Sequence, residues 1–151
     1  KWVEDVAQRS DEISVNPMNI QRGTIIDRLH RNNEYRPPWL WSLVEMIRRV
    51  HPTIHPNGGK NGDEDQVCRL IIHPTAGGRV RGAHNCGSCD SVVVAAIERY
   101  AVSGELEEFE GLGCSCELAW KEELLLEQAL PVPLGISKHR RGNLLNRLRS
   151  L

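Results

Sequence analysis

Two close pairs of cysteines constrain this chain more than any other feature of its 151 residues. Cys86 and Cys89 form a C-x-x-C, Cys114 and Cys116 form a C-x-C, and 24 residues separate the two pairs. Two such pairs are a common way to present four thiolates to one tetrahedral zinc ion. The sequence therefore predicts a zinc site made of these four cysteines. His84, two residues before Cys86, is an alternative ligand.

The segment between the pairs reads as a buried helix from about Asp90 to Ser103, with Gly104 as its stop. The start of a helix offers unpaired N–H groups and a positive dipole end, which favour thiolate over thiol at a preceding C-x-x-C. A metal, an electrophile and a disulfide partner all require a thiolate, so this position leaves zinc binding, catalysis and thiol–disulfide exchange open. The cysteines could also be small buried apolar side chains, but their tight pairing favours zinc.

The overall composition excludes several classes of protein. Lys and Arg total 19 against 20 Asp and Glu, so the net charge of −1 gives no global electrostatic case for nucleic acid or a membrane surface. The longest apolar run, 92–97, is far shorter than the roughly 20 residues of a membrane span. The odd cysteine count and the tight pairs favour a reducing, intracellular compartment, cytoplasm or nucleus, over a disulfide scaffold. Because the first residue is Lys, we expect an excised or processed part of a longer chain.

The residue patterns predict an α+β fold, mostly helical with a small sheet and stabilised by zinc. We expect a single domain over 1–151, with a flexible loop at 51–65 and a basic tail at 137–151. A strand is expected over 67–72, stopped by Pro74, with a short return strand at 79–81. Helices are expected within 1–16, from Thr24 onward, from Pro38 to near Val50, over 90–103 and over 118–130.

Two features suggest contact surfaces. The tail carries a basic patch that could contact phosphates or form part of a partner-binding helix, and its residues are Lys138, Arg140, Arg141 and Arg147. Trp39 and Trp41 lie on one expected helix and cannot both face one core, so we expect one of them on a binding surface or packed on the neighbouring Pro-Pro segment.

The run CGSC at Cys86–Cys89, followed by AAIERYAVSGEL, resembles the nucleophile segment of papain-like cysteine proteases. The resemblance implies that Cys89 is the nucleophile and Cys86 its disulfide-forming neighbour. The sequence departs from that family at Asp90, where the family has Trp. His139 is the sole histidine after Cys89, and it has no Asn-Ser-Trp context.

The stretch FEGLGCSC at Phe109–Cys116, together with the upstream C-x-x-C, resembles the end of the DYW-type deaminase domains of RNA-editing proteins. The resemblance implies one zinc at Cys86 and Cys89 and a second at Cys114 and Cys116. Zinc deaminases need a His-x-Glu whose carboxylate moves protons around a zinc-bound water. No His-x-Glu occurs in this chain, so we expect a deaminase-like version to be inactive or to use another residue.

These features give a primary hypothesis and an alternative. The primary hypothesis is a zinc-stabilised intracellular module that binds or regulates a protein or nucleic-acid partner, with no membrane role. The alternative is an enzyme with its site at the C-x-x-C helix, either a deaminase-like zinc hydrolase or a papain-like protease that uses Cys89. The sequence leaves the catalytic residues and the oligomeric state undetermined.

Overall fold

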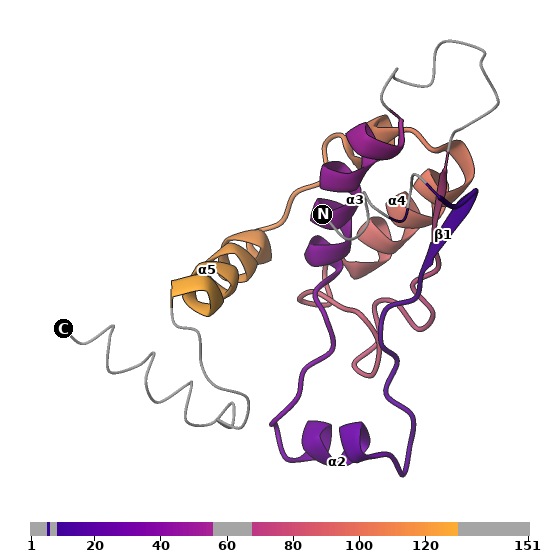
Figure 1. Cartoon of the computed structure of the whole chain (residues 1–151). Helices are drawn as coiled ribbons and strands as arrows, with labels where there is room; N and C mark the ends of the chain where they lie inside the picture. Colours follow the sequence, from indigo (N-terminus) through magenta and orange to yellow (C-terminus); the bar gives the residue numbers. More distant parts are fainter. Residues whose placement is uncertain (1–5, 7–8, 56–67, 130–151) are drawn as a thin grey trace.

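The computed structural model describes residues 6, 9–55 and 68–129, with side chains placed as far as residue 125 (Figure 1). The fold is α+β, mostly helical with a small sheet, as the sequence predicted. In chain order its elements are β1 (Glu12–Val15), α2 (Ile25–Arg31), α3 (Leu40–Ile54), β2 (Arg69–Ile72), α4 (Asp90–Ser103), the 3-10 turn η2 (Leu106–Phe109) and α5 (Cys116–Ala129).

β1 and β2 form a two-stranded parallel sheet. Ile13 lies opposite Leu70 and Val15 opposite Ile72, so the apolar side chains of both strands share the face that packs on the helices. α3 and α4 both contact β2 and each other. The buried core lies between these two helices and the sheet.

α3 forms because its apolar residues recur every three or four positions and make one buried stripe. Leu40, Val44 and Ile47 on that stripe are fully buried. The helix begins directly after Pro37, Pro38 and Trp39 and continues to Ile54, with Pro52 in its last turn. The expected end near Val50 and the expected start of the loop at 51 were therefore wrong, because one proline in a last turn removes few helical hydrogen bonds. Residues 56–67, the rest of the expected loop, lie outside the described residues.

α2 stands apart from the core at the end of two extended segments (Figure 1). Thr24 caps it as predicted, since its Oγ1 accepts a hydrogen bond of 3.1 Å from the backbone N–H of Asp27. We call residues 17–36, which comprise α2 and its flanking segments, the arm. α4 also matches its prediction, and it ends at Gly104 in the left-handed conformation with φ of 73°.

One strand was missed and one expected strand is wrong. Residues 12–15 form β1, because Ile13 and Val15 alternate along an extended strand and pair with β2. The helix expected within 1–16 rested on residues before these, of which Val6 is described and is helical. Residues 1–5 and 7–8 lie outside the described part of the chain. The expected return strand at 79–81 lies instead in turns, where the N–H of Gly78 donates to the carbonyl oxygen of Ala83. The predictions of a single domain and of a basic helical tail stay predictions, since 130–151 are also outside the described residues.

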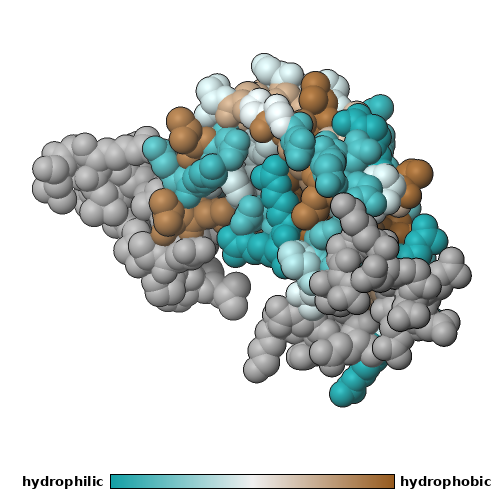
Figure 2. Space-filling view, turned by 90° about the horizontal axis from the view of Figure 1, so that it is seen from above, coloured by the Kyte–Doolittle hydropathy of each residue, from teal (hydrophilic) through white to brown (hydrophobic). Residues whose placement is uncertain are grey.

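Seen from above, the described surface shows small apolar patches separated by polar side chains (Figure 2). Val102 and Leu118 are among the exposed apolar residues. Among the described residues, no helix has both the length and the apolar character needed to cross a membrane.

Candidate metal centre

The Sγ atoms of all four paired cysteines lie within 4.8 Å of one another. Cys86 Sγ is 3.8 Å from Cys89 Sγ and 3.7 Å from Cys114 Sγ, and Cys89 Sγ is 3.6 Å from Cys116 Sγ. Zinc–sulfur bonds of about 2.3 Å in a tetrahedron place the sulfurs about 3.8 Å apart. The cluster therefore has the dimensions of one tetrahedral four-thiolate metal site.

The same distances bear on other uses of four cysteines. A disulfide would bring two sulfurs to about 2 Å, and all five cysteines of the chain are free. Four thiolates in tetrahedral array suit zinc or an iron–sulfur cluster. A cluster of several irons and sulfides holds its cysteine sulfurs farther apart than a single ion does, so the observed spacing favours one ion.

Two helices and two turns position the ligands. Cys89 immediately precedes α4, and Cys116 is the first residue of α5. Cys86 lies on the turn before α4, where Gly87 has a φ of 93°, in the region that glycine adopts without steric cost. Cys114 lies on the segment that connects η2 to α5. One metal ion at this site would connect the start of α4 to the start of α5.

The electrostatics of the four sulfurs differ. The backbone N–H groups of Cys89 and Ser88 point at Cys86 Sγ and lower the pKa of that exposed thiol to about 6. Burial raises the pKa of Cys89, and it raises the pKa of Cys116 to about 12 despite an opposing hydrogen bond from Trp41. The sulfurs of Cys89 and Cys116 therefore need a cation beside them to become thiolates at neutral pH.

Asn85 and Asp90 hold the turn that carries Cys86 and Cys89. Asn85 is buried, and its Nδ2 donates to Cys89 Sγ at 3.4 Å while its Oδ1 accepts from the backbone N–H of Trp41 at 3.2 Å. Asp90 Oδ1 accepts from the backbone N–H of Asn85 at 2.9 Å and from that of Gly87 at 3.3 Å. Such partners orient metal ligands.

Tryptophans from the start of α3 contact the other cysteine pair and α5. Trp41 is buried, and its Nε1 donates to Cys116 Sγ at 3.3 Å. Trp39 is half-buried; its Nε1 donates to Glu123 Oε2 at 2.9 Å, and the guanidinium of Arg36 stacks 3.6 Å from its ring centre. The two tryptophans, which are two positions apart in the sequence, thus face different surroundings.

The structure brings together the four cysteines that the sequence singled out, and their assignment as metal ligands stays a prediction. His84 is not part of the cluster; its Nδ1 lies 2.9 Å from the carbonyl oxygen of Gly82. The expected basic contact residues of the tail lie outside the described residues: Lys138, Arg140, Arg141 and Arg147. Sequence reasoning gave no role at the site to Asn85 or Asp90, whose only signal was that they flank the C-x-x-C. It considered Trp41 for a binding surface and not for contact with a cysteine.

No protein-family model matches the chain, and no solved structure matches it significantly. Curated relatives exist, however. The chain is similar to archaeosine synthase subunit beta. It is 32% identical to the Methanosarcina acetivorans protein over 125 residues, which are 83% of this chain and 33% of that protein. It is 34% identical to the Thermococcus kodakarensis protein over 125 residues, 80% of this chain and 34% of that protein. The chain thus spans about a third of the length of these relatives.

These relatives correct both family resemblances drawn from the sequence. The chain is similar to archaeosine synthase subunit beta and not to the DYW-type deaminases or the papain-like proteases, whose short motifs it shares only locally. The geometry agrees. Cys89 Sγ contacts Asn85 and other cysteine sulfurs, and the four sulfurs form one cluster in place of two zinc sites.

Proposed function

We propose that this chain is a metal-stabilised module within a subunit of an RNA-modifying enzyme related to archaeosine synthase. The similarity to two archaeosine synthase beta subunits over four-fifths of the chain supports the enzyme context. The name of those relatives describes one subunit of a synthase, so we propose a further protein subunit and tRNA as the partners. Reduced, metal-bound cysteines suit the intracellular setting of such an enzyme.

Within that enzyme the module binds one zinc ion through Cys86, Cys89, Cys114 and Cys116. The single observation that carries this proposal is the Sγ spacing of 3.6 to 3.8 Å, which fits a tetrahedral ion. Four protein ligands leave no open position for a water or a substrate, so the ion is structural. Its role is to hold α5 and the C-x-C segment against α3 and α4.

Metal analysis of protein purified without a chelator tests the site. We expect about one zinc per chain, with neither iron nor sulfide. Cys114→Ala should lower zinc affinity by more than the roughly 10–100-fold that the loss of an outer-shell partner costs. Cys68→Ala is the matched control, because Cys68 is buried in the core away from the cluster and its loss should leave the zinc content unchanged. Iron with sulfide, or a normal zinc content in Cys114→Ala, would contradict the proposal.

Nucleoside analysis tests the enzyme context. Deletion of the gene for the full-length protein should remove archaeosine from the tRNA of its host, as measured by mass spectrometry of digested tRNA. Restoring the gene should return the nucleoside, and the Cys114→Ala gene should do so poorly. Unchanged archaeosine after deletion would reject this context while leaving the zinc site standing.

A further inference from the structure

The arm and the loop at 73–83 form a region of unusual charge. Together they contain six arginines and only two carboxylates, Asp27 and Glu34. The rest of the chain has thirteen Lys and Arg against eighteen Asp and Glu, so positive charge is concentrated here in a chain that is slightly acidic overall. We call the arginines of the arm and of this loop that lie away from the metal centre the basic patch: Arg22, Arg28, Arg31, Arg79 and Arg81.

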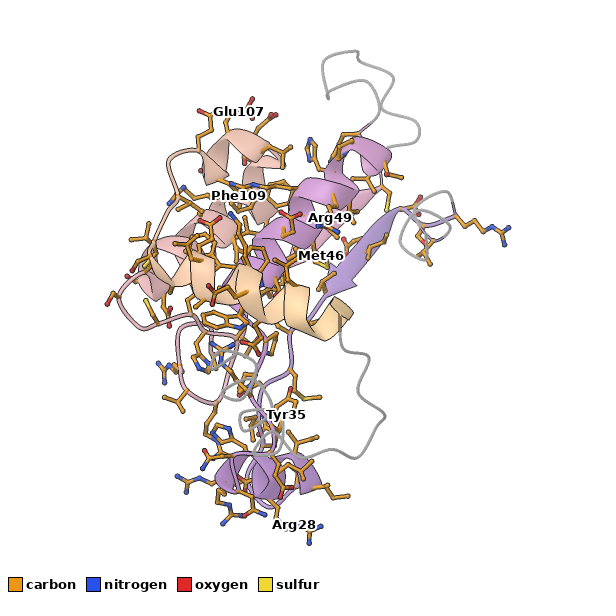
Figure 3. All side chains as sticks on the ribbon, turned by 90° about the vertical axis from the view of Figure 1, so that its left-hand side faces the viewer. Arg28, Tyr35, Met46, Arg49, Glu107 and Phe109 are labelled. Atoms are coloured by element: carbon orange, nitrogen blue, oxygen red, sulfur yellow. The ribbon has the colours of Figure 1, made fainter. Side chains whose placement is uncertain are left out.

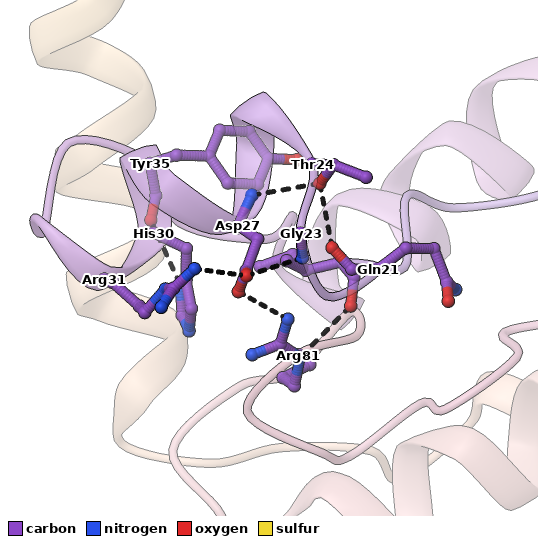
Figure 4. Close-up of polar contacts among 9 residues, drawn as sticks. Gln21, Gly23, Thr24, Asp27, His30, Arg31, Tyr35 and Arg81 are labelled. Atoms are coloured by element: carbon purple, nitrogen blue, oxygen red, sulfur yellow. Dashed lines mark hydrogen bonds and ion pairs between the residues drawn. The ribbon is translucent and has the colours of Figure 1, made fainter.

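Asp27 organises the patch (Figure 4). The Asp27 side chain is only 4% exposed, and its Oδ1 pairs with Arg81 Nη2 at 2.6 Å while its Oδ2 pairs with Arg31 Nη2 at 2.8 Å. One buried negative charge therefore holds two guanidiniums side by side. Each guanidinium has five N–H donors, and the side chains of Arg31 and Arg81 remain 67% and 35% exposed. Apart from Nε of Arg81, which donates to a backbone carbonyl oxygen, the N–H groups that Asp27 does not use remain for another anion.

Backbone contacts fix the arm to the loop. The N–H of Ile20 donates to the carbonyl oxygen of Arg81 at 2.8 Å, and Nε of Arg81 donates back to the carbonyl oxygen of Ile20 at 3.1 Å. Ile20 is buried at this junction. Arg31 and Arg81 are thus held in place before any partner arrives, which reduces the entropy that these two side chains lose on binding.

We propose that the arm binds the phosphate backbone of RNA through the basic patch. This inference rests on the proposed function for its RNA partner. The planar, multiply donating guanidinium suits phosphate oxygens. Contacts of this kind position an RNA on the protein without reading its sequence. Arg28 lies at the far end of the arm, well away from Arg49 on α3 (Figure 3), so the arm extends the reach of the patch beyond the core.

The test measures the binding of an unmodified tRNA transcript to the full-length protein by fluorescence anisotropy at several salt concentrations. The variant is Arg22→Glu/Arg28→Glu, which changes two exposed arginines and leaves the pairs of Asp27 intact. We expect the variant to bind tRNA at least about tenfold more weakly. The slope of the logarithm of the binding constant against the logarithm of the salt concentration should also be smaller in magnitude by about two, one for each lost phosphate contact.

The control is Arg49→Glu/Arg69→Glu, with the same change of charge at exposed positions on α3 and β2. It should bind close to wild type. Equal weakening by both variants, or none by the arm variant, would overturn the inference while the proposed function stands. Failure of the wild-type protein to bind tRNA would overturn both. Unchanged tRNA binding with lost association to another enzyme subunit would show that the patch binds an acidic protein surface and would also reject the inference.

Discussion

Asn85 is the residue that connects the metal turn to the start of α3. Its amide contacts a cysteine sulfur on one side and the backbone N–H of Trp41 on the other. The two segments also meet directly, because the N–H of His84 donates to the carbonyl oxygen of Pro38 at 3.1 Å. Through these two contacts the Asn85 side chain orients a cysteine of the cluster and also gives the buried N–H of Trp41 a hydrogen-bond partner.

Asn85→Ala tests this role. Loss of the amide should lower zinc affinity about 10–100-fold, and the unpaired N–H of Trp41 should lower the free energy of unfolding by about 1–3 kcal/mol. Competition with a chromophoric chelator and urea unfolding measure the two effects. Asn16→Ala removes an exposed side-chain contact with Ser14 and should change neither quantity. Unaltered zinc affinity in Asn85→Ala would reject an orienting role.

The pKa values of the cysteine thiols predict how many protons are released when zinc binds. Backbone N–H groups lower the pKa of Cys86 to about 6, whereas burial raises the pKa values of Cys89 and Cys116. Zinc binding at pH 7 should therefore release at least about two protons, and affinity should fall as pH falls. Calorimetry in two buffers of different ionisation enthalpy counts these protons. Binding without proton release would mean that the buried thiols are not ligands.

At the scale of elements, α5 meets the core through the buried Trp120, the partly buried Leu124 and several polar contacts. Trp120 Nε1 donates to Ser42 Oγ at 2.9 Å, Glu123 accepts from Trp39, and Cys116 lies in the cluster. A 14-residue helix is marginal by itself in water. The metal is thus expected to account for a large part of the docking of α5.

Hydrogen exchange with and without a chelator tests this expectation. Metal removal should expose the amides of α5 to exchange, while α3, α4 and the sheet keep their protection because they share the apolar core. Equal protection of α5 in both conditions would show that side-chain packing alone holds it. Loss of protection in every element at once would show that the metal stabilises the whole fold.

The stability of the arm depends on the charge of Asp27. The N–H of Gly23 and then the side chain of Arg81 hold the pKa of Asp27 at about 2, below its ordinary value of 3.8. Because folding favours the carboxylate, this contribution to stability is present above pH 3.8 and is lost as pH falls toward 2. In an NMR titration, the amide of Ile20 should shift with a midpoint of about 2.

Asp27→Asn should abolish that titration and weaken the protection of the arm at pH 7, with α3 and α4 unchanged. Glu34→Gln, which removes an exposed carboxylate of the same arm, is the control and should leave both observations as in the wild type. A titration that persists in Asp27→Asn would assign it to another group.

Sequence patterns correctly predicted the elements that depend on interactions between residues close together in the chain. The apolar stripe of α3, the Thr24 cap of α2 and the Gly104 stop of α4 all involve residues within a few positions of one another. β1 was missed because a four-residue strand has little signal of its own and exists through its pairing with β2, 57 positions along the chain (Ile13 with Leu70). The two strands come together only when the rest of the core has assembled around them.

At the scale of the whole molecule, the cysteine spacing predicted the site, and the fold determined its surroundings. The residue type and the close spacing of the four cysteines are visible in the sequence, and these two properties were enough to predict the cluster. Trp41 reaches Cys116 across 75 positions, and Arg81 reaches Asp27 across 54. Sequence periodicity does not report contacts at such separations, so no pattern indicated that Asp27 gathers arginines of the arm and the loop. The prediction of basic contact residues in the tail stays a prediction.

In this account four thiolates bind a single metal ion, which joins α4 to α5. X-ray absorption spectroscopy of the purified protein at the zinc edge identifies the atoms bound to that ion. We predict a shell of about four sulfurs at about 2.3 Å and no metal–metal scattering. A shell with nitrogen or oxygen neighbours, or iron with metal–metal scattering, would contradict the claim.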